Sequence, residues 1–109
     1  MGRVTKESIL KALEEKRKQK PLTGVEKEMV DNVLEYELVD HERYKVSMYA
    51  DKEVQNFTII HMNRNDIREC REIHFPENKK DSLKEYLIEG GFNVQEYDFD
   101  KTKTLFTIS

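Results

Sequence analysis

The chain has 109 residues, the size of one domain, of which 37% are hydrophobic and 38% are charged. Globular domains usually hold roughly 45–50% hydrophobic and about 25% charged residues, so we expect a thin core under a highly charged surface with a net charge of −3. This composition excludes an internal disulfide framework, because there is one cysteine, and a membrane-spanning segment, because no apolar run approaches about 20 residues.

The first predicted helix covers Thr5–Gln19. Its apolar stripe is short and consists of Ile9, Leu10 and Leu13, at spacings that place them on one helical face. Thr5 can cap the helix through its hydroxyl group. The helix ends before Pro21, because the residue that precedes a proline is excluded from helical backbone.

The second predicted helix begins at a capping box formed by Thr23 and Glu26. Apolar residues then recur at a period of 3.6 to about Val39. The loop between the two helices has only two or three residues, which is typical of antiparallel neighbours. We therefore expect residues 1–40 to form a helical hairpin, which either packs on the rest of the protein or projects from it.

Three strands follow in the predicted order. Residues 44–50 alternate between apolar and polar side chains, as in a half-buried strand. Residues 57–62 are apolar on both faces, which suits a covered strand. Residues 67–75 fit either a helix or a strand, and we favour a strand over 69–75 because Pro76 holds Phe75 extended.

The last third predicts a helix over 78–89 followed by a two-stranded hairpin over 92–99 and 103–109. Asn78 is the expected cap of this helix, and Gly90 is the expected left-handed residue after it. The final strand has no proline or inward charge that would protect an edge, so it could pair with another chain. The alternative is that it is paired inside the sheet.

These elements predict one α+β domain, 1–109, in the order α-α-β-β-β-α-β-β. We expect an antiparallel sheet of about five strands with one helix packed on it. The expected core residues are the large apolar side chains on the predicted inner faces: Leu34, Phe57, Ile59, Leu83, Leu87, Phe92 and Phe106.

One group of residues could hold a metal or supply a nucleophile: His61, Cys70 and His74. Zinc usually takes three or four such ligands at regular spacings, and here there is no second cysteine. A small interior cysteine and two strand histidines are the simpler interpretation. The sequence also has no phosphate-binding loop and no nucleophile elbow. We therefore expect no metal, no cofactor and no enzymatic activity.

The remaining class is a small binding or regulatory protein that acts on another protein, with a homodimer as one alternative. Lys outnumbers Arg, a composition that resembles small regulators from AT-rich bacteria and their phages. With one cysteine and no apolar secretory signal, we expect a cytoplasmic protein. Residues 21–60 are strongly acidic, and the candidate protein-binding residues are Glu28, Asp31, Glu35, Glu37, Asp40 and Glu42.

The alternative is a nucleic-acid-binding protein that uses its basic first helix, since cations that neutralise phosphates supply most of such affinity. Residues 1–20 carry seven Lys or Arg and three Glu. The candidate residues are Lys11, Lys16, Arg17, Lys18 and Lys20, with a second group at Arg64, Arg68, Lys79 and Lys80. A basic helix end also complements the helix dipole, which needs no ligand.

Overall fold

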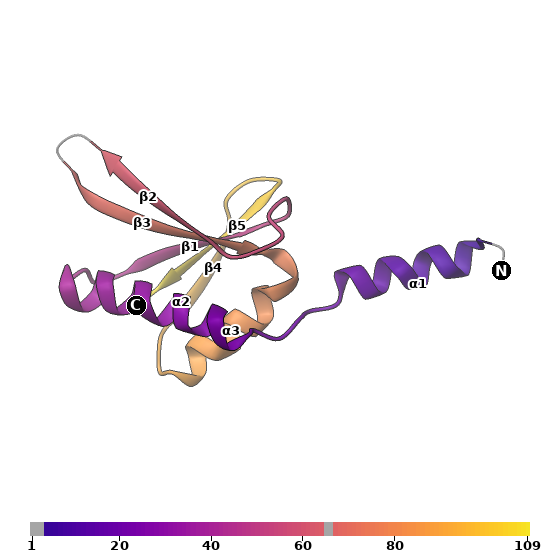
Figure 1. Cartoon of the computed structure of the whole chain (residues 1–109), viewed down its shortest axis with the longest axis horizontal. Helices are drawn as coiled ribbons and strands as arrows, with labels where there is room; N and C mark the ends of the chain where they lie inside the picture. The colour runs from indigo at the N-terminus through magenta and orange to yellow at the C-terminus, as the bar shows by residue number, and fades with distance from the viewer. Residues whose placement is uncertain (1–3, 65–66) are drawn as a thin grey trace.

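The computed structural model describes residues 4–64 and 67–109, without the side chains of 16–17, 62–64 and 67–70. Its elements are α1 (Lys6–Arg17), α2 (Gly24–Leu34), the π-helix η1 (Glu35–Asp40), β1 (Val46–Asp51), β2 (Thr58–Arg64), β3 (Ile67–Pro76), the 3-10 turn η2 (Glu77–Lys79), α3 (Lys80–Glu89), β4 (Val94–Asp98) and β5 (Lys103–Ile108). This is an α+β domain with the predicted order of helices and strands, and 67–75 is a strand (Figure 1).

The five strands form one sheet in the order β2-β3-β1-β5-β4. The sheet is mixed, which corrects the prediction that it is antiparallel throughout: β1 and β3 are parallel, and the other pairs are antiparallel. The physical reason is that β2 does not pair with β1. Instead β3 lies between β2 and β1. It runs antiparallel to β2 and therefore in the same direction as β1. Of the two alternatives left open for the last strand, β5 takes the interior one, and the edges are β2 and β4.

Both α2 and α3 pack on one face of the sheet (Figure 1). The core consists of side chains from this face and from the two helices, and every buried strand residue in it has the same parity along its strand. The buried hydrophobic residues are Val30, Val33, Leu34, Val46, Met48, Ala50, Phe57, Ile73, Phe75, Leu83, Leu87, Phe106 and Ile108. Of the seven predicted core residues, five are buried, and Ile59 and Phe92 are partly buried against them.

The predicted helical hairpin is wrong, because α1 does not fold back on α2 but projects from the domain (Figure 1). Thr5 caps α1 and Thr23 caps α2, as expected, each in a capping box. Between them the backbone is extended at Lys18, with φ −61° and ψ 133°. The short connection therefore directs α1 away from α2, since a tight reversal needs turn geometry that this extended backbone lacks.

The ends of α3 differ from the prediction. Asn78 does not cap the helix: it lies in η2, and the N-cap position is Lys79. The side chain that accepts a hydrogen bond from the first turn comes from Gln19, 3.1 Å from the Asp81 nitrogen. At the other end Gly90 keeps helical backbone at φ −76°, and Gly91 is the left-handed residue at φ 89°. The helix ends at Glu89 before the glycine pair, as predicted, and only the left-handed residue lies one position later than expected.

Candidate protein-binding site

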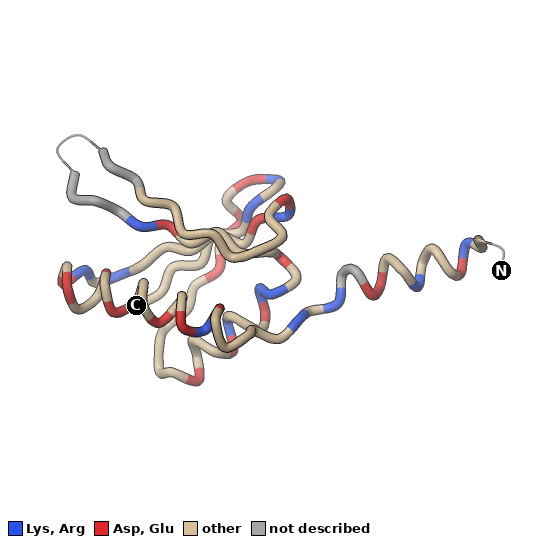
Figure 2. Tube along the Cα trace, viewed as in Figure 1, with Lys and Arg blue, Asp and Glu red and all other residues tan. Residues whose placement is uncertain are grey.

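The acidic residues predicted to bind a protein lie on or just after α2. Glu28, Asp31 and Glu35 are exposed and spaced by three and four residues, so they share one helical face. Asp40, the last residue of η1, and Glu42, in the turn after it, are also exposed. In Figure 2, the positions of Asp and Glu recur in red along this segment.

Asp31 also joins the two helices. The hydroxyl group of Tyr86, on α3, donates to the Asp31 carboxylate at 2.7 Å and 2.8 Å. This hydrogen bond, with burial and the negative charge of Asp31 as smaller causes, raises the pKa of Tyr86. Part of the acidic face therefore has a structural role.

Glu37 does not belong to this surface, which corrects its assignment as a binding residue. It is 3% exposed. One carboxylate oxygen pairs with the Arg43 Nε at 2.8 Å, and the other accepts from the Arg71 backbone N–H at 3.2 Å. The sequence signal was its position seven residues after Val30 and three after Leu34, which places it on the buried stripe of the helix. The carboxylate ties the helical segment to β3.

Among the described basic residues proposed for a nucleic acid, Lys20 lies beside the segment that carries Lys79 and Lys80, since its backbone N–H donates to the Asn78 carbonyl at 2.7 Å. Lys11, Lys18 and Lys20 are exposed on α1 and its linker. Lys79 is paired with Glu26 and Lys80 with Glu96, the latter at 3.8 Å, so each of these two cations is partly neutralised by its own carboxylate. The side chains of Lys16, Arg17, Arg64 and Arg68 lie outside the described part of the chain.

The Glu26–Lys79 pair also fixes the start of α2 to η2. Burial alone would raise the pKa of Glu26, but hydrogen bonds from Lys79 and Thr23 outweigh it and hold that pKa below its ordinary value. Glu26 thus completes the capping box and an ion pair at once.

The structure does not bring the three candidate metal ligands together. In the antiparallel pair β2–β3, His74 is opposite Thr58 and His61 is opposite Arg71. Because side chains alternate between faces along a strand, His61 and His74 lie on opposite faces of the sheet. The Cys70 side chain is outside the described residues. Within the described residues, no group of three His, Cys, Asp or Glu side chains could hold a metal ion.

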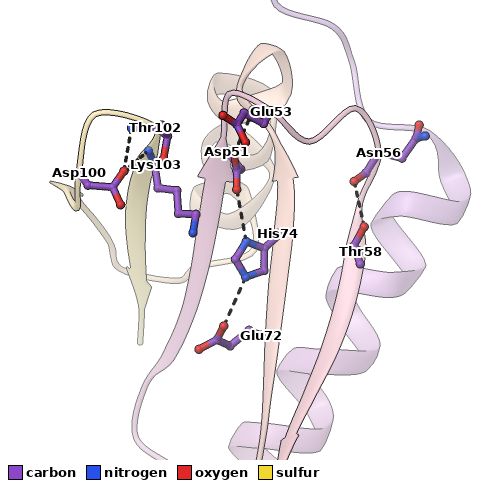
Figure 3. A network of polar contacts seen from close by, with 9 residues as sticks. All are labelled: Asp51, Glu53, Asn56, Thr58, Glu72, His74, Asp100, Thr102 and Lys103. Atoms are coloured by element: carbon purple, nitrogen blue, oxygen red, sulfur yellow. Dashed lines mark hydrogen bonds and ion pairs between the residues drawn. The ribbon is translucent and has the colours of Figure 1, made fainter.

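His74 has carboxylates on both sides (Figure 3). Its Nε2 is 3.3 Å from Glu72, and its Nδ1 is 3.8 Å from Asp51. A protonated ring can interact favourably with both carboxylates, whereas a neutral ring can donate to only one. Both ring nitrogens of His74 therefore face acids of the protein itself.

Around His74, aromatic and apolar side chains form a row across the sheet face opposite α2 and α3. In the strand registers, His74 pairs with Tyr49, Tyr49 with Leu105, and Leu105 with Tyr97. The Tyr49 and His74 rings stack at 5.0 Å, and Phe99 contacts Tyr49 edge-on at 5.4 Å. We call these five residues the aromatic row.

The aromatic row is a surface, because no helix of the described residues lies on it. Tyr97 is 50% and Phe99 is 56% exposed. Sequence reasoning did not identify this row. Alternation separates the two faces of each strand, but it does not say which strands are neighbours, and the row exists only because β3, β1, β5 and β4 lie in this order.

The second unusual surface is the apolar stripe of α1. Ile9 is 50%, Leu10 is 54% and Leu13 is 41% exposed. The stripe was predicted, but it was expected to pack in a hairpin. The exposed stripe of α1 and the exposed rings of Tyr97 and Phe99 are therefore the apolar features available to a partner.

Comparisons of the chain with models of protein families, with curated proteins and with solved structures found no match. In the described part of the chain, no helix has the length and apolar character needed to cross a membrane.

Proposed function

We propose that this protein is a non-catalytic, regulatory protein that works by binding another protein through α1. The observation that carries the proposal is the exposed apolar stripe on a helix that projects from the domain. An isolated helix shorter than about 12–15 residues is marginal in water, and packing supplies most helix stability in proteins. α1 has 12 residues, so it gains stability when its stripe is covered.

The gain on binding comes from the stripe. Ile9, Leu10 and Leu13 are about half exposed, and burying such a side chain completely contributes about 1.5–3 kcal/mol. Covering the exposed half of each contributes about 1 kcal/mol per residue by the same measure. Three residues can therefore anchor a contact of modest affinity, which the rest of the interface must complete.

The acidic face of α2 suits the rim of such a contact. Glu28, Glu35 and Asp40 are exposed and like-charged. Exposed charges at an interface mainly steer association and exclude wrong partners. They favour a protein partner with a basic patch and disfavour a phosphate backbone.

The experiment compares four forms of the full chain. The stripe variant is L10S/L13S, and the acidic variant is E35K/D40K. The control K11S/E15S introduces the same two serines on the side of α1 opposite the stripe, with net charge unchanged. Each form, immobilised, is used to capture proteins from a lysate of the source cells. A captured protein is then purified, and its affinity for each form is measured by calorimetry.

The proposal predicts one protein that the wild type and the control retain alike. The stripe variant should bind it at least tenfold more weakly, since serine removes most of the buried apolar area. The acidic variant should mainly slow association. If all four forms retain the same proteins with equal affinity, α1 is not a binding element and the proposal fails.

A further inference from the structure

β2 lies at an edge of the sheet, although its sequence is typical of an interior strand. In the sheet of the described residues, its one neighbour is β3. The ladder with β3 is regular over 58–62 and shifts register between Met62 and Arg64. Residues 57–62 contain no proline and no Asp, Glu, Lys or Arg, the residues that usually keep an edge from pairing with another chain. The sequence of β2 therefore indicates that a further strand pairs with it.

The opposite edge, β4, is protected by charge. Glu96 is opposite Phe106 in the register of β4 with β5, and Phe106 is fully buried under the helices. Glu96, and with it Asp98 two residues later, therefore lies on the side of β4 that faces the helices. Charges directed inward from an edge strand prevent another strand from adding to it. Of the two edges, the regular part of β2 is the one without such protection.

The backbone of β2 has hydrogen-bonding groups to offer. Every second residue of an antiparallel edge strand directs its N–H and C=O groups away from its neighbour. In the described part of the chain, no backbone hydrogen bond from outside the sheet reaches residues 58–61. The side chains of Thr58, Ile60 and His61 are exposed, so an extended segment can approach. A row of alternating donors and acceptors is satisfied as a set by another strand.

The strand that fits this edge is β2 of a second copy. Two antiparallel β2 strands related by a two-fold axis at Ile60 place Ile60 opposite Ile60, Ile59 opposite His61, and Thr58 opposite Met62. No acidic or basic side chain is set against one of like charge. Ile60, which is 40% exposed, packs on an identical side chain. This self-complementarity is what a two-fold interface requires, since the same patch lies on both sides of it.

We propose that two copies of this chain form a dimer by antiparallel pairing of β2 with β2, which joins their sheets into one continuous sheet. The inference goes beyond the proposed function and does not depend on it, because β2 and α1 are separate surfaces. The two-fold axis closes the assembly at two copies. Each copy keeps its α1 uncovered, so the dimer presents two binding helices.

Sedimentation equilibrium tests the dimer. One pair of short strands is a small interface of the kind found in weak complexes, so the mass is measured at concentrations up to about 0.5 mM. The wild type and Ile60→Val should dimerise alike. Ile60→Lys sets two like charges opposite each other and should weaken the dimer at least tenfold.

The matched control is Gln95→Lys. Gln95 is exposed, lies on the other edge strand and shares the sheet face of Ile60, so this variant adds the same charge away from the proposed interface and should dimerise as the wild type does. Circular dichroism checks that each variant is folded. If Ile60→Lys does not fold, Thr58→Lys, at another exposed position of β2, replaces it.

Amide hydrogen exchange locates the contact. With β3 as its one neighbour, β2 has every second amide protected. Paired on both sides, it should have consecutive protected amides over residues 59–61. The wild type at the highest concentration should show this protection, and it should disappear on dilution and in Ile60→Lys.

Four outcomes overturn the inference. The first two are a wild type that is monomeric at every concentration and an Ile60→Lys variant that dimerises as well as the wild type. The third is a dimer that the stripe variant L10S/L13S loses, which would mean that the copies meet through α1. The fourth is an assembly larger than a dimer that Gln95→Lys also weakens, which would mean that β2 pairs with β4. A monomeric wild type that still captures a protein through α1 would overturn the dimer and leave the proposed function standing.

Discussion

Gln19 and Asp81 are far apart in the sequence, yet the Gln19 side-chain Oε1 accepts a hydrogen bond from the Asp81 backbone N–H at 3.1 Å. The linker thereby caps a helix that has no capping side chain of its own. A residue between two helices stabilises the beginning of a third, and the same contact fixes the direction in which α1 projects.

Gln19→Ala should therefore destabilise the protein by about 1 kcal/mol, the usual cost of a lost N-cap interaction. Gln19→Glu keeps the acceptor oxygen and adds a negative charge near a helix N-terminus, so it should retain stability. Urea denaturation measures both. Gln55→Ala, at an exposed loop position, is the matched control and should change stability by less than about 0.5 kcal/mol.

Glu37→Ala should cost about 3 kcal/mol, because it leaves Arg43 and a backbone N–H of β3 without their buried acceptor. Glu35→Ala, two residues earlier and exposed, should stay within about 0.5 kcal/mol of the wild type. Thermal unfolding followed by circular dichroism compares them. Equal effects of the two substitutions would contradict the buried role of Glu37.

Glu26 makes stability depend on pH in the acidic range. Its pKa is lower in the folded protein than the ordinary value of 4.5, so the unfolded chain binds more protons near that pH. The contribution of Glu26 is complete above about pH 5 and disappears as the pH falls through the folded pKa. The melting temperature of the wild type should exceed that of Glu26→Gln at pH 7, and the difference should shrink by pH 3. Glu28→Gln, which is exposed, should show no such convergence.

Tyr86 should lose its proton at higher pH than an ordinary tyrosine, because its phenol donates to Asp31. Asp31→Asn removes the negative charge and should lower the pKa of Tyr86 toward 10.0, its ordinary value. NMR titration of the tyrosine rings measures this, with Tyr86→Phe identifying the signal. Any stability from this contact is complete below pH 10 and is lost as the pH rises through the folded pKa. An unchanged Tyr86 titration in Asp31→Asn would show that the hydrogen bond does not form in solution.

Phe106→Ala should destabilise the protein by about 3–5 kcal/mol, because a fully buried ring is replaced by a cavity. Phe106 contacts the Phe75 ring, at 5.4 Å between centroids. Phe99→Ala removes the same ring from the exposed face and should cost far less in unfolding measurements. The comparison separates residues that stabilise the fold from residues that are available for binding. A large loss of stability in Phe99→Ala would show that Phe99 belongs to the first group.

The local features of this fold could be predicted from the sequence. Each depends on neighbouring residues: the capping box at Thr23 and Glu26, the alternation in β1, and the glycine pair after α3. The fold class, the five strands and the order of elements followed from these signals. Strand 67–75 was the ambiguous case, and pairing with β1 and β2 decided it.

The features that the sequence did not predict depend on contacts between distant residues. Gln19 replaced Asn78 as the cap because the linker passes the start of α3. Glu37 was read as a surface acid, since the Arg43 side chain and the Arg71 backbone that satisfy it approach only in the fold. The aromatic row needs strand neighbours that are distant in the chain, so no periodicity could reveal it.

β1 lies at the centre of the sheet, between β3 and β5, and its antiparallel partner is the last strand in chain order. During synthesis, Val46, Met48 and Ala50 therefore emerge long before the strand that completes their sheet. Until β5 leaves the ribosome, one side of β1 is an open backbone edge beside uncovered apolar side chains, the kind of surface that aggregates or recruits chaperones. The contacts between β1 and β5 are non-local, so their closure should be a slow step of folding.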